Sequence, residues 1–165
     1  MSNLETVLHA YQGTMSIRQA TEMEVGSLAD FFSSQPEDSY TFFKPHGFDV
    51  SSLRKLVRNR AFLMFIVFDG GKIVGYFFLR CFFIGKSYLG KLVDLEYRGK
   101  GIGKMMCLTA MGVAQQLGLH MYETISRHNL ASLYSTKKVL DVRILEEMDN
   151  DYIYIEDYPK RTLTD

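Results

Sequence analysis

Three glycines at alternate positions form one segment with basic residues between and beside them. The segment follows an apolar run and reads Arg98-Gly99-Lys100-Gly101-Ile102-Gly103-Lys104. A glycine-rich turn between a strand and a helix lets the backbone approach a ligand closely, because glycine has no Cβ. The first amides of the following helix lack intrahelical partners, and the helix dipole favours an anion there. The sequence therefore predicts a phosphate-binding turn, at which the basic side chains raise the positive potential.

The spacing of these glycines excludes two common nucleotide fingerprints. A dinucleotide site has G-x-G-x-x-G, and a P-loop has G-x-x-x-x-G-K-[ST]. Here the residue five before Gly103 is Arg98, and Met105 follows Lys104. The pattern that matches is Arg/Gln-x-x-Gly-x-Gly/Ala, so the segment resembles motif A of the GNAT superfamily of acyl-CoA-dependent N-acyltransferases. A plain strand-to-helix turn without a ligand is the alternative.

A second segment, residues 125–134, is similar to the other signature of that family. The resemblance implies that Asn129 and Ser132 lie near the cofactor and that a tyrosine acts as general acid beside the thioester sulfur. The family tyrosine usually stands seven residues after the Asn, where this chain has Thr136, whereas Tyr134 stands five after. Two residues turn a helical side chain by about 200°, so Tyr134 is the candidate acid only if the helix begins in a shifted register. Otherwise Tyr134 is a core tyrosine, and Asn129 could equally be a helix cap alone.

The acylation itself asks for few further groups. The resemblance implies that the backbone at Val93 pairs with the pantetheine arm, and an amide near it could hold the oxyanion. A base or a water chain must also take a proton from the attacking amine. The candidates are Glu123 above all, then Asp94, Glu96 and His46.

The acceptor side is predicted from an aromatic loop. Residues 36–48 contain two prolines and a glycine, which indicate irregular chain, yet the loop is crowded with aromatic residues. We expect Tyr40, Phe43 and His46 to bind the acceptor, and stacking faces of this kind suit a compact amine such as an amino sugar. The alternative is that these aromatic side chains fill the core beneath two helices.

The hydrophobic pattern predicts the order β-α-α-β-β-β-α-β-α-β-β. The likeness to the GNAT fold covers about residues 15–158 and implies an α/β (α+β) class: a central mixed, mostly antiparallel sheet with helices on both faces and a splayed strand pair. The expected strands are 16–21, 62–68, 73–83, 88–95, 120–126, 142–148 and 152–157; the expected helices are 21–34, 51–60, 103–117 and 130–139.

Composition sets further bounds. The chain has 165 residues and a formal net charge of zero. The length favours one domain over residues 1–165, with 1–14 as an N-terminal extension, and the resemblance implies that this is an acetyltransferase domain. The neutral charge argues against nucleic-acid binding. No apolar run is long enough for a membrane span, and no signal pattern is seen, so we expect a cytoplasmic protein. We expect it to be a monomer or a homodimer. Cys81 and Cys107 are expected to be buried thiols, without spacing for a metal.

Together these features lead to one hypothesis and two rivals. The resemblance implies an acetyl-CoA-dependent N-acetyltransferase that acylates the primary amine of a small acceptor and needs no metal. A non-catalytic acyl-CoA sensor or scaffold module is the first rival, since position 136 is not tyrosine. A protein or peptide N-acetyltransferase is the second.

Overall fold

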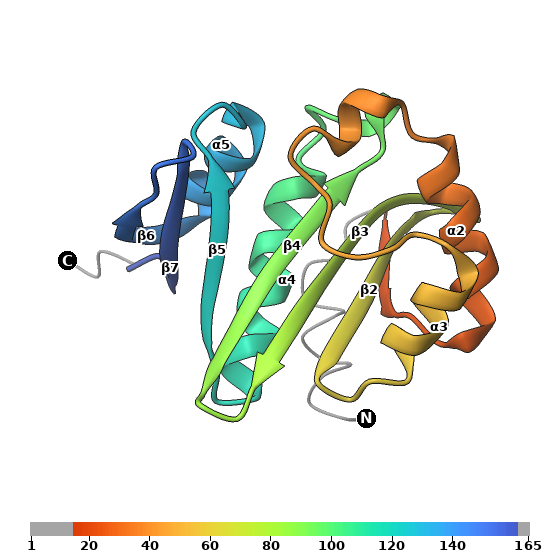
Figure 1. Cartoon of the computed structure of the whole chain (residues 1–165), viewed down its shortest axis with the longest axis horizontal. Helices are drawn as coiled ribbons and strands as arrows, with labels where there is room; N and C mark the ends of the chain where they lie inside the picture. Colours follow the sequence, from red (N-terminus) through yellow and green to blue (C-terminus); the bar gives the residue numbers. More distant parts are fainter. Residues whose placement is uncertain (1–14, 162–165) are drawn as a thin grey trace.

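The computed structural model describes residues 15–161. Its centre is a seven-stranded sheet in the order β1-β2-β3-β4-β5-β7-β6, in which only β4 and β5 are parallel neighbours (Figure 1). The expected mixed, mostly antiparallel sheet is confirmed. The strands are β1 (Ser16–Gln19), β2 (Phe62–Asp69), β3 (Lys72–Phe82), β4 (Lys86–Val93), β5 (His120–Ser126), β6 (Leu140–Glu147) and β7 (Tyr152–Pro159). The prediction for residues 1–14 lies outside the described residues.

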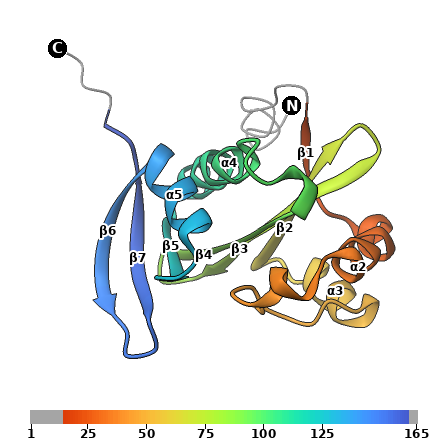
Figure 2. The same cartoon turned by 90° about the horizontal axis from the view of Figure 1, so that it is seen from above.

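Helices cover both faces of the sheet. The pair α2 (Val25–Ser34) and α3 (Val50–Val57) packs on one face, and α4 (Ile102–Gln116) and α5 (Leu130–Val139) lie on the other (Figure 2). Three short 3-10 turns, η1 (Glu22–Glu24), η2 (Glu37–Tyr40) and η3 (Leu95–Tyr97), join these elements. The two faces carry separate apolar clusters, so the sheet is buried on both sides over β2 and β3.

Capping residues explain where the helices begin. Thr21 and Glu24 form the predicted capping box before α2, and the Asn129 side chain accepts a hydrogen bond from the amide of Ser132 at the start of α5, as expected. The helix expected from Ser51 or Ser52 begins at Val50, because Asp49 caps it by accepting from the Ser52 amide at 3.0 Å.

Strand β4 ends earlier than its apolar pattern predicts. The expectation of a strand to Leu95 is wrong, since β4 ends at Val93. Asp94 follows it as the cap of η3, with its carboxylate accepting from the Glu96 amide at 2.9 Å. The apolar run therefore continues into a turn, and the exposed side chain of Leu95 belongs to that turn.

The two parallel strands separate, as the predicted splayed pair requires. Strands β4 and β5 are paired from Lys86 to Tyr88 against His120 to Tyr122, and the pairing stops there although both strands continue. Beyond this point β5 remains paired with β7 as far as Ser126. A gap therefore opens in the middle of the sheet, toward the glycine turn.

Two further features bear on the sequence-based expectations. Cys107 is buried and Cys81 is half-buried, and both thiols are free. Among the described helices, none combines the length and the apolar character that crossing a membrane demands.

Candidate functional site

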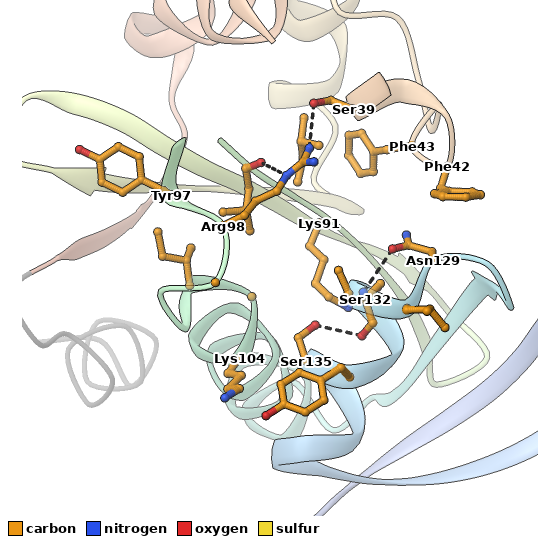
Figure 3. Close-up of a pocket in the computed structure, with 18 of the residues that line it drawn as sticks. Ser39, Phe42, Phe43, Lys91, Tyr97, Arg98, Lys104, Asn129, Ser132 and Ser135 are labelled. Carbon is orange, nitrogen blue, oxygen red and sulfur yellow. Dashed lines mark hydrogen bonds between the residues drawn. The ribbon is translucent and has the colours of Figure 1, made fainter. Parts of the chain in front are cut away.

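A cavity of about 460 Å³ lies where the splayed strands, the glycine turn and the aromatic loop meet (Figure 3). Its walls come from the loop containing η2, the end of β4, the start of α4 and the first turns of α5. The lining residues are Asp38, Ser39, Phe42, Phe43, Lys91, Leu92, Val93, Tyr97, Arg98, Gly99, Gly101, Ile102, Gly103, Lys104, His128, Asn129, Leu130, Ala131, Ser132, Tyr134 and Ser135.

The glycine turn adopts a conformation that suits glycine. Gly99 and Gly101 have φ angles of +76° and +87°, a left-handed region that other residues rarely adopt. A Cβ built at either position would meet no atom within 4 Å, so it would project into open space. The backbone at this turn is therefore open to a ligand, as the phosphate-binding hypothesis requires.

The amides at the start of α4 are also available. The first helical bond runs from the Met105 amide to the Gly101 carbonyl at 3.1 Å, so the helix itself does not use the amides of Ile102, Gly103 and Lys104. A Cβ at Gly103 would lie 3.2 Å from the Cβ of Ser135, which shows how closely α4 and α5 approach here. These amides and the helix dipole make the site suitable for a diphosphate.

A buried glutamine holds the turn in place. Gln35 Nε2 donates to Asp94 at 3.0 Å, and Gln35 Oε1 accepts from the Leu95 amide at 3.2 Å. Asp94 is thereby occupied from two sides, since it also caps η3. Glu96 lies on the surface in an ion pair with Lys72 at 3.0 Å. Neither candidate base thus faces the cavity.

The basic residues of the motif take different positions. Arg98 donates to the Ser39 hydroxyl at 2.8 Å and to the Val93 carbonyl at 3.5 Å, so it connects the turn with η2 across the cavity wall (Figure 3). Lys104 also lines the cavity, with its ammonium 5.1 Å from the centre of the Tyr134 ring. Lys100 instead lies over the ring of Tyr97 at 4.5 Å.

The backbone of Val93 faces the gap between the splayed strands. The amide of the next residue, Asp94, donates to Val74 of β3 at 2.9 Å. Because successive residues of a strand direct their hydrogen-bonding groups to opposite sides, the Val93 amide points away from β3. The group predicted to pair with a pantetheine arm is thus directed toward the cavity.

Helix α5 carries Tyr134 and Thr136, the two residues compared with the family tyrosine. It begins at Leu130, directly after Asn129, as the sequence predicted. Tyr134 is 60% exposed at the rim of the cavity, whereas Thr136 is fully buried. Asn129 and Ser132 both line the cavity, and Asn129 is at the same time the cap of α5. The predicted roles of Tyr134 as acid and of Asn129 and Ser132 in cofactor binding stay predictions.

Glu123 lies in a buried polar cluster. Its carboxylate accepts from Lys91 Nζ at 2.6 Å and from the Thr136 hydroxyl at 2.9 Å. Close by, burial and the Glu123 carboxylate raise the pKa of Asp157 to about 9, and burial raises the pKa of the Cys107 thiol to about 11. Both oxygens of Glu123 are therefore occupied, and its predicted role as base stays a prediction.

The aromatic loop divides into two parts. Phe43 lines the cavity beside Phe42, whereas Tyr40 and His46 do not. The Tyr40 hydroxyl donates to the Phe32 carbonyl. His46 packs against the rings of the α2 face, with contacts to the Gly47 carbonyl at 2.8 Å and the Tyr76 hydroxyl at 3.0 Å, and burial lowers its pKa. The predicted role of these three residues in acceptor binding stays a prediction.

Several residues of this site escaped the sequence analysis, among them Gln35, Ser39, Phe42 and Lys91. Gln35 and Ser39 act across about sixty positions of sequence, and nothing local marks them. Lys91 could have been found, because it falls between the apolar residues Leu89 and Val93 on the same face of β4. Glu123 likewise falls between Met121 and Ile125 on β5.

Comparison with known proteins shows to which family the chain belongs. The model of the acetyltransferase (GNAT) family matches residues 27–137, which is more than half of the 165 residues. The chain therefore belongs to the GNAT family of acetyltransferases. No protein with a curated description matches the sequence significantly.

Several solved structures share the fold at low sequence identity. AAC(6')-Ib in complex with paromomycin and acetyl-CoA superposes with a TM-score of 0.69 and 12% identity, covering 93% of this chain and 99% of that chain. The PaiA N-acetyltransferase from Thermoplasma acidophilum, in complex with coenzyme A, superposes with a TM-score of 0.70 and 16% identity, covering 88% of this chain and 99% of that chain. A ribosomal-protein alanine acetyltransferase from Vibrio fischeri superposes with a TM-score of 0.72 and 13% identity, covering 93% of this chain and 97% of that chain.

Proposed function

We propose that this acetyltransferase transfers an acetyl group from acetyl-CoA to the primary amine of a small acceptor, with amino sugars as the first class to test. The observation that carries the proposal is the open glycine turn: Gly101 is left-handed, and the first residues of α4, whose amides lack intrahelical partners, line the cavity. These groups suit the diphosphate of CoA, and Arg98 and Lys104 add positive charge. The neighbours crystallised with acetyl-CoA or CoA support the same donor.

The donor site leaves the reactive end of the cosubstrate near the strand gap. With the diphosphate at the turn, the arm extends along the free edge of β4, where the Val93 amide is available. An amide in this position would stabilise the negative charge that develops on the carbonyl oxygen. Since Glu123, Asp94, Glu96 and His46 are each engaged by other groups, we propose that water takes the proton of the attacking amine.

The acceptor would enter past the two phenylalanines at the cavity wall. Phe42 is 39% exposed and Phe43 is half-buried, so both present ring surface to an incoming molecule. AAC(6')-Ib, a structural neighbour, has also been solved with ribostamycin, which supports an amino-sugar acceptor as the first to be tested.

A panel experiment tests this function. Purified protein is supplied with acetyl-CoA and with amino sugars, linear polyamines or short peptides, and release of the CoA thiol is followed. We expect turnover with at least one small amine. A Phe42→Ala variant should raise the KM for that amine without changing the KM for acetyl-CoA. Phe83→Ala is the matched control, because Phe83 is fully exposed at the β3–β4 turn.

The non-catalytic rival is favoured by one observation, the buried Thr136 at the position of the family tyrosine. Tight binding of acetyl-CoA without turnover on any amine would support that rival and contradict the proposed activity. Turnover on peptides alone would favour the protein N-acetyltransferase instead. Tyr134→Phe tests the remaining candidate acid, since loss of its hydroxyl should lower kcat if it donates a proton.

A further inference from the structure

A buried ion pair crosses the gap between the splayed strands. Lys91 on β4 and Glu123 on β5 have side chains that are 6% and 4% exposed, and Lys91 Nζ lies 2.6 Å from Glu123 Oε2. The pair stands just beyond Tyr88 and Tyr122, where the backbone pairing of the two strands stops. It therefore closes the gap on the side of the sheet that α4 and α5 cover.

Lys91 is also one of the residues that line the cavity. Three residues of β4 line the cavity, and Lys91 is the charged one beside Leu92 and Val93 (Figure 3). The glycine turn lies at the other end of this stretch of β4. A ligand whose diphosphate binds at the turn and whose arm follows the edge of β4 therefore extends from Val93 toward Lys91.

The geometry holds the ammonium in one place. Lys91 donates to Glu123 and, at 3.0 Å, to the hydroxyl of Thr136, and that hydroxyl donates to the other oxygen of Glu123 at 2.9 Å. Within residues 15–161 these are the two acceptors found for Lys91, so the third N–H of its ammonium is left for another partner. Burial opposes the charge, but Cys107 and Glu123 outweigh it and raise the pKa of Lys91.

This arrangement is costly for folding alone. A buried ion pair is often no better for stability than apolar side chains of similar volume, because both charges lose their hydration. The same region also holds Asp157, a carboxyl group that is 3% exposed and that keeps its proton because burial and Glu123 raise its pKa to about 9. An ion pair kept at such a cost beside a ligand cavity points to a role in chemistry.

We propose that Lys91 is a catalytic residue that binds the CoA thiolate as it leaves, and that Glu123 and Thr136 are positioning residues for its ammonium. The inference rests on the proposed function. In the step, the amine nitrogen forms a bond to the acetyl carbon, the C–S bond breaks, and its electron pair stays on sulfur. The Lys91 ammonium keeps its proton and pairs with the thiolate, while the proton lost by the amine goes to water.

The test compares the binding of CoA with that of desulfo-CoA, which lacks the sulfur, by calorimetry between pH 6.5 and 9. If the ammonium contacts the sulfur, the bound thiol ionises more readily than the free thiol. The affinity for CoA should then increase relative to desulfo-CoA by about tenfold over this range, which corresponds to about 1.4 kcal/mol. The charged and titratable groups around Lys91 are Glu123 on β5, Cys107 on α4 and Asp157 on β7. The part of their titration that does not depend on the sulfur affects both ligands alike and cancels in the comparison.

The variants separate the inference from the proposed function. Lys91→Met alone leaves a buried carboxylate unpaired, so Lys91→Met/Glu123→Gln is the variant chosen to fold. It should still bind desulfo-CoA but should lose the pH-dependent preference for CoA. Identical pH profiles of the two ligands in the wild-type protein, or a preference that survives in the double variant, would overturn the role of Lys91. Failure of the wild-type protein to bind either ligand would overturn the proposed function and this inference with it.

Discussion

Gly101→Ala separates the cost of an unfavourable backbone conformation from the loss of a ligand. Gly101 has a φ of +87°, and an L-residue in the left-handed region costs roughly 1–2 kcal/mol. In a domain of this size such a loss lowers Tm by about 2–8 °C. The added Cβ meets no protein atom within 4 Å, so protein crowding adds nothing. A bound diphosphate, however, would meet that Cβ. Loss of one charge-assisted hydrogen bond, at about 1.5–3 kcal/mol, would weaken CoA binding by roughly 10- to 100-fold.

Gly85→Ala is the matched control for this experiment. Gly85 has a φ of +78° and equally open surroundings, but it lies in the β3–β4 turn, outside the cavity lining. Both variants should lose similar stability in urea unfolding. Only Gly101→Ala should lose affinity for CoA in calorimetry, measured well below its Tm. Wild-type affinity in Gly101→Ala, or an equal loss in Gly85→Ala, would refute the assignment of the diphosphate to this turn.

Three further changes test particular contacts. Gly103→Ala brings a Cβ to 3.2 Å from that of Ser135, so in urea unfolding it should be about 1 kcal/mol less favourable in the wild-type background than in a Ser135→Gly background; an equal effect in both backgrounds would contradict this contact. The raised pKa of Asp157, about 9 against 3.8, means that the folded state holds its proton over a range in which the unfolded chain has lost it. The contribution of this group to stability therefore falls as pH rises from about 4 to 9. The free energy of unfolding of Asp157→Asn should rise relative to that of the wild type between pH 5 and 8.5, and a difference that stays constant over this range would refute the raised pKa. Asn129→Ala should cost about 1 kcal/mol for the lost cap. Asn129→Asp should restore stability while still weakening CoA binding if the amide also contacts the ligand, and full recovery of both would show a cap alone.

The sequence predicted the elements well where the signal is local. Strand β5 and helix α5 have the expected bounds, and Asn129 caps α5 as its residue type suggested. The glycine turn was predicted because glycine spacing and a following apolar helix are themselves local patterns. The error at the end of β4 has the same origin: Leu95 extends an apolar run, and only the hydrogen bond of the Asp94 side chain shows that the strand has ended.

What escaped prediction depends on contacts between distant segments. Gln35 holds the turn across about sixty residues, and no periodicity connects the two. Glu123 was singled out as a proton acceptor from its place on the splayed strand. That reasoning did not include Lys91, which occupies one of its oxygens. The aromatic residues of the loop differ in position in a way that the sequence does not show: Phe43 lines the cavity, whereas His46 packs against Phe32 and Tyr76.

The separation of β4 and β5 links the cost of the fold to its chemistry. A strand that loses its neighbour presents unpaired amides, which elsewhere are covered or protected against unwanted pairing. On β4 these amides belong to residues whose side chains face α4, among them Val93 and Lys91. A ligand arm that pairs with this edge would satisfy the backbone and, by the same alternation, lie beside the Lys91 ammonium. The gap that weakens the sheet thus brings a backbone donor and a buried positive charge to the same short stretch of one strand, the two groups to which we assign the oxyanion and the leaving thiolate.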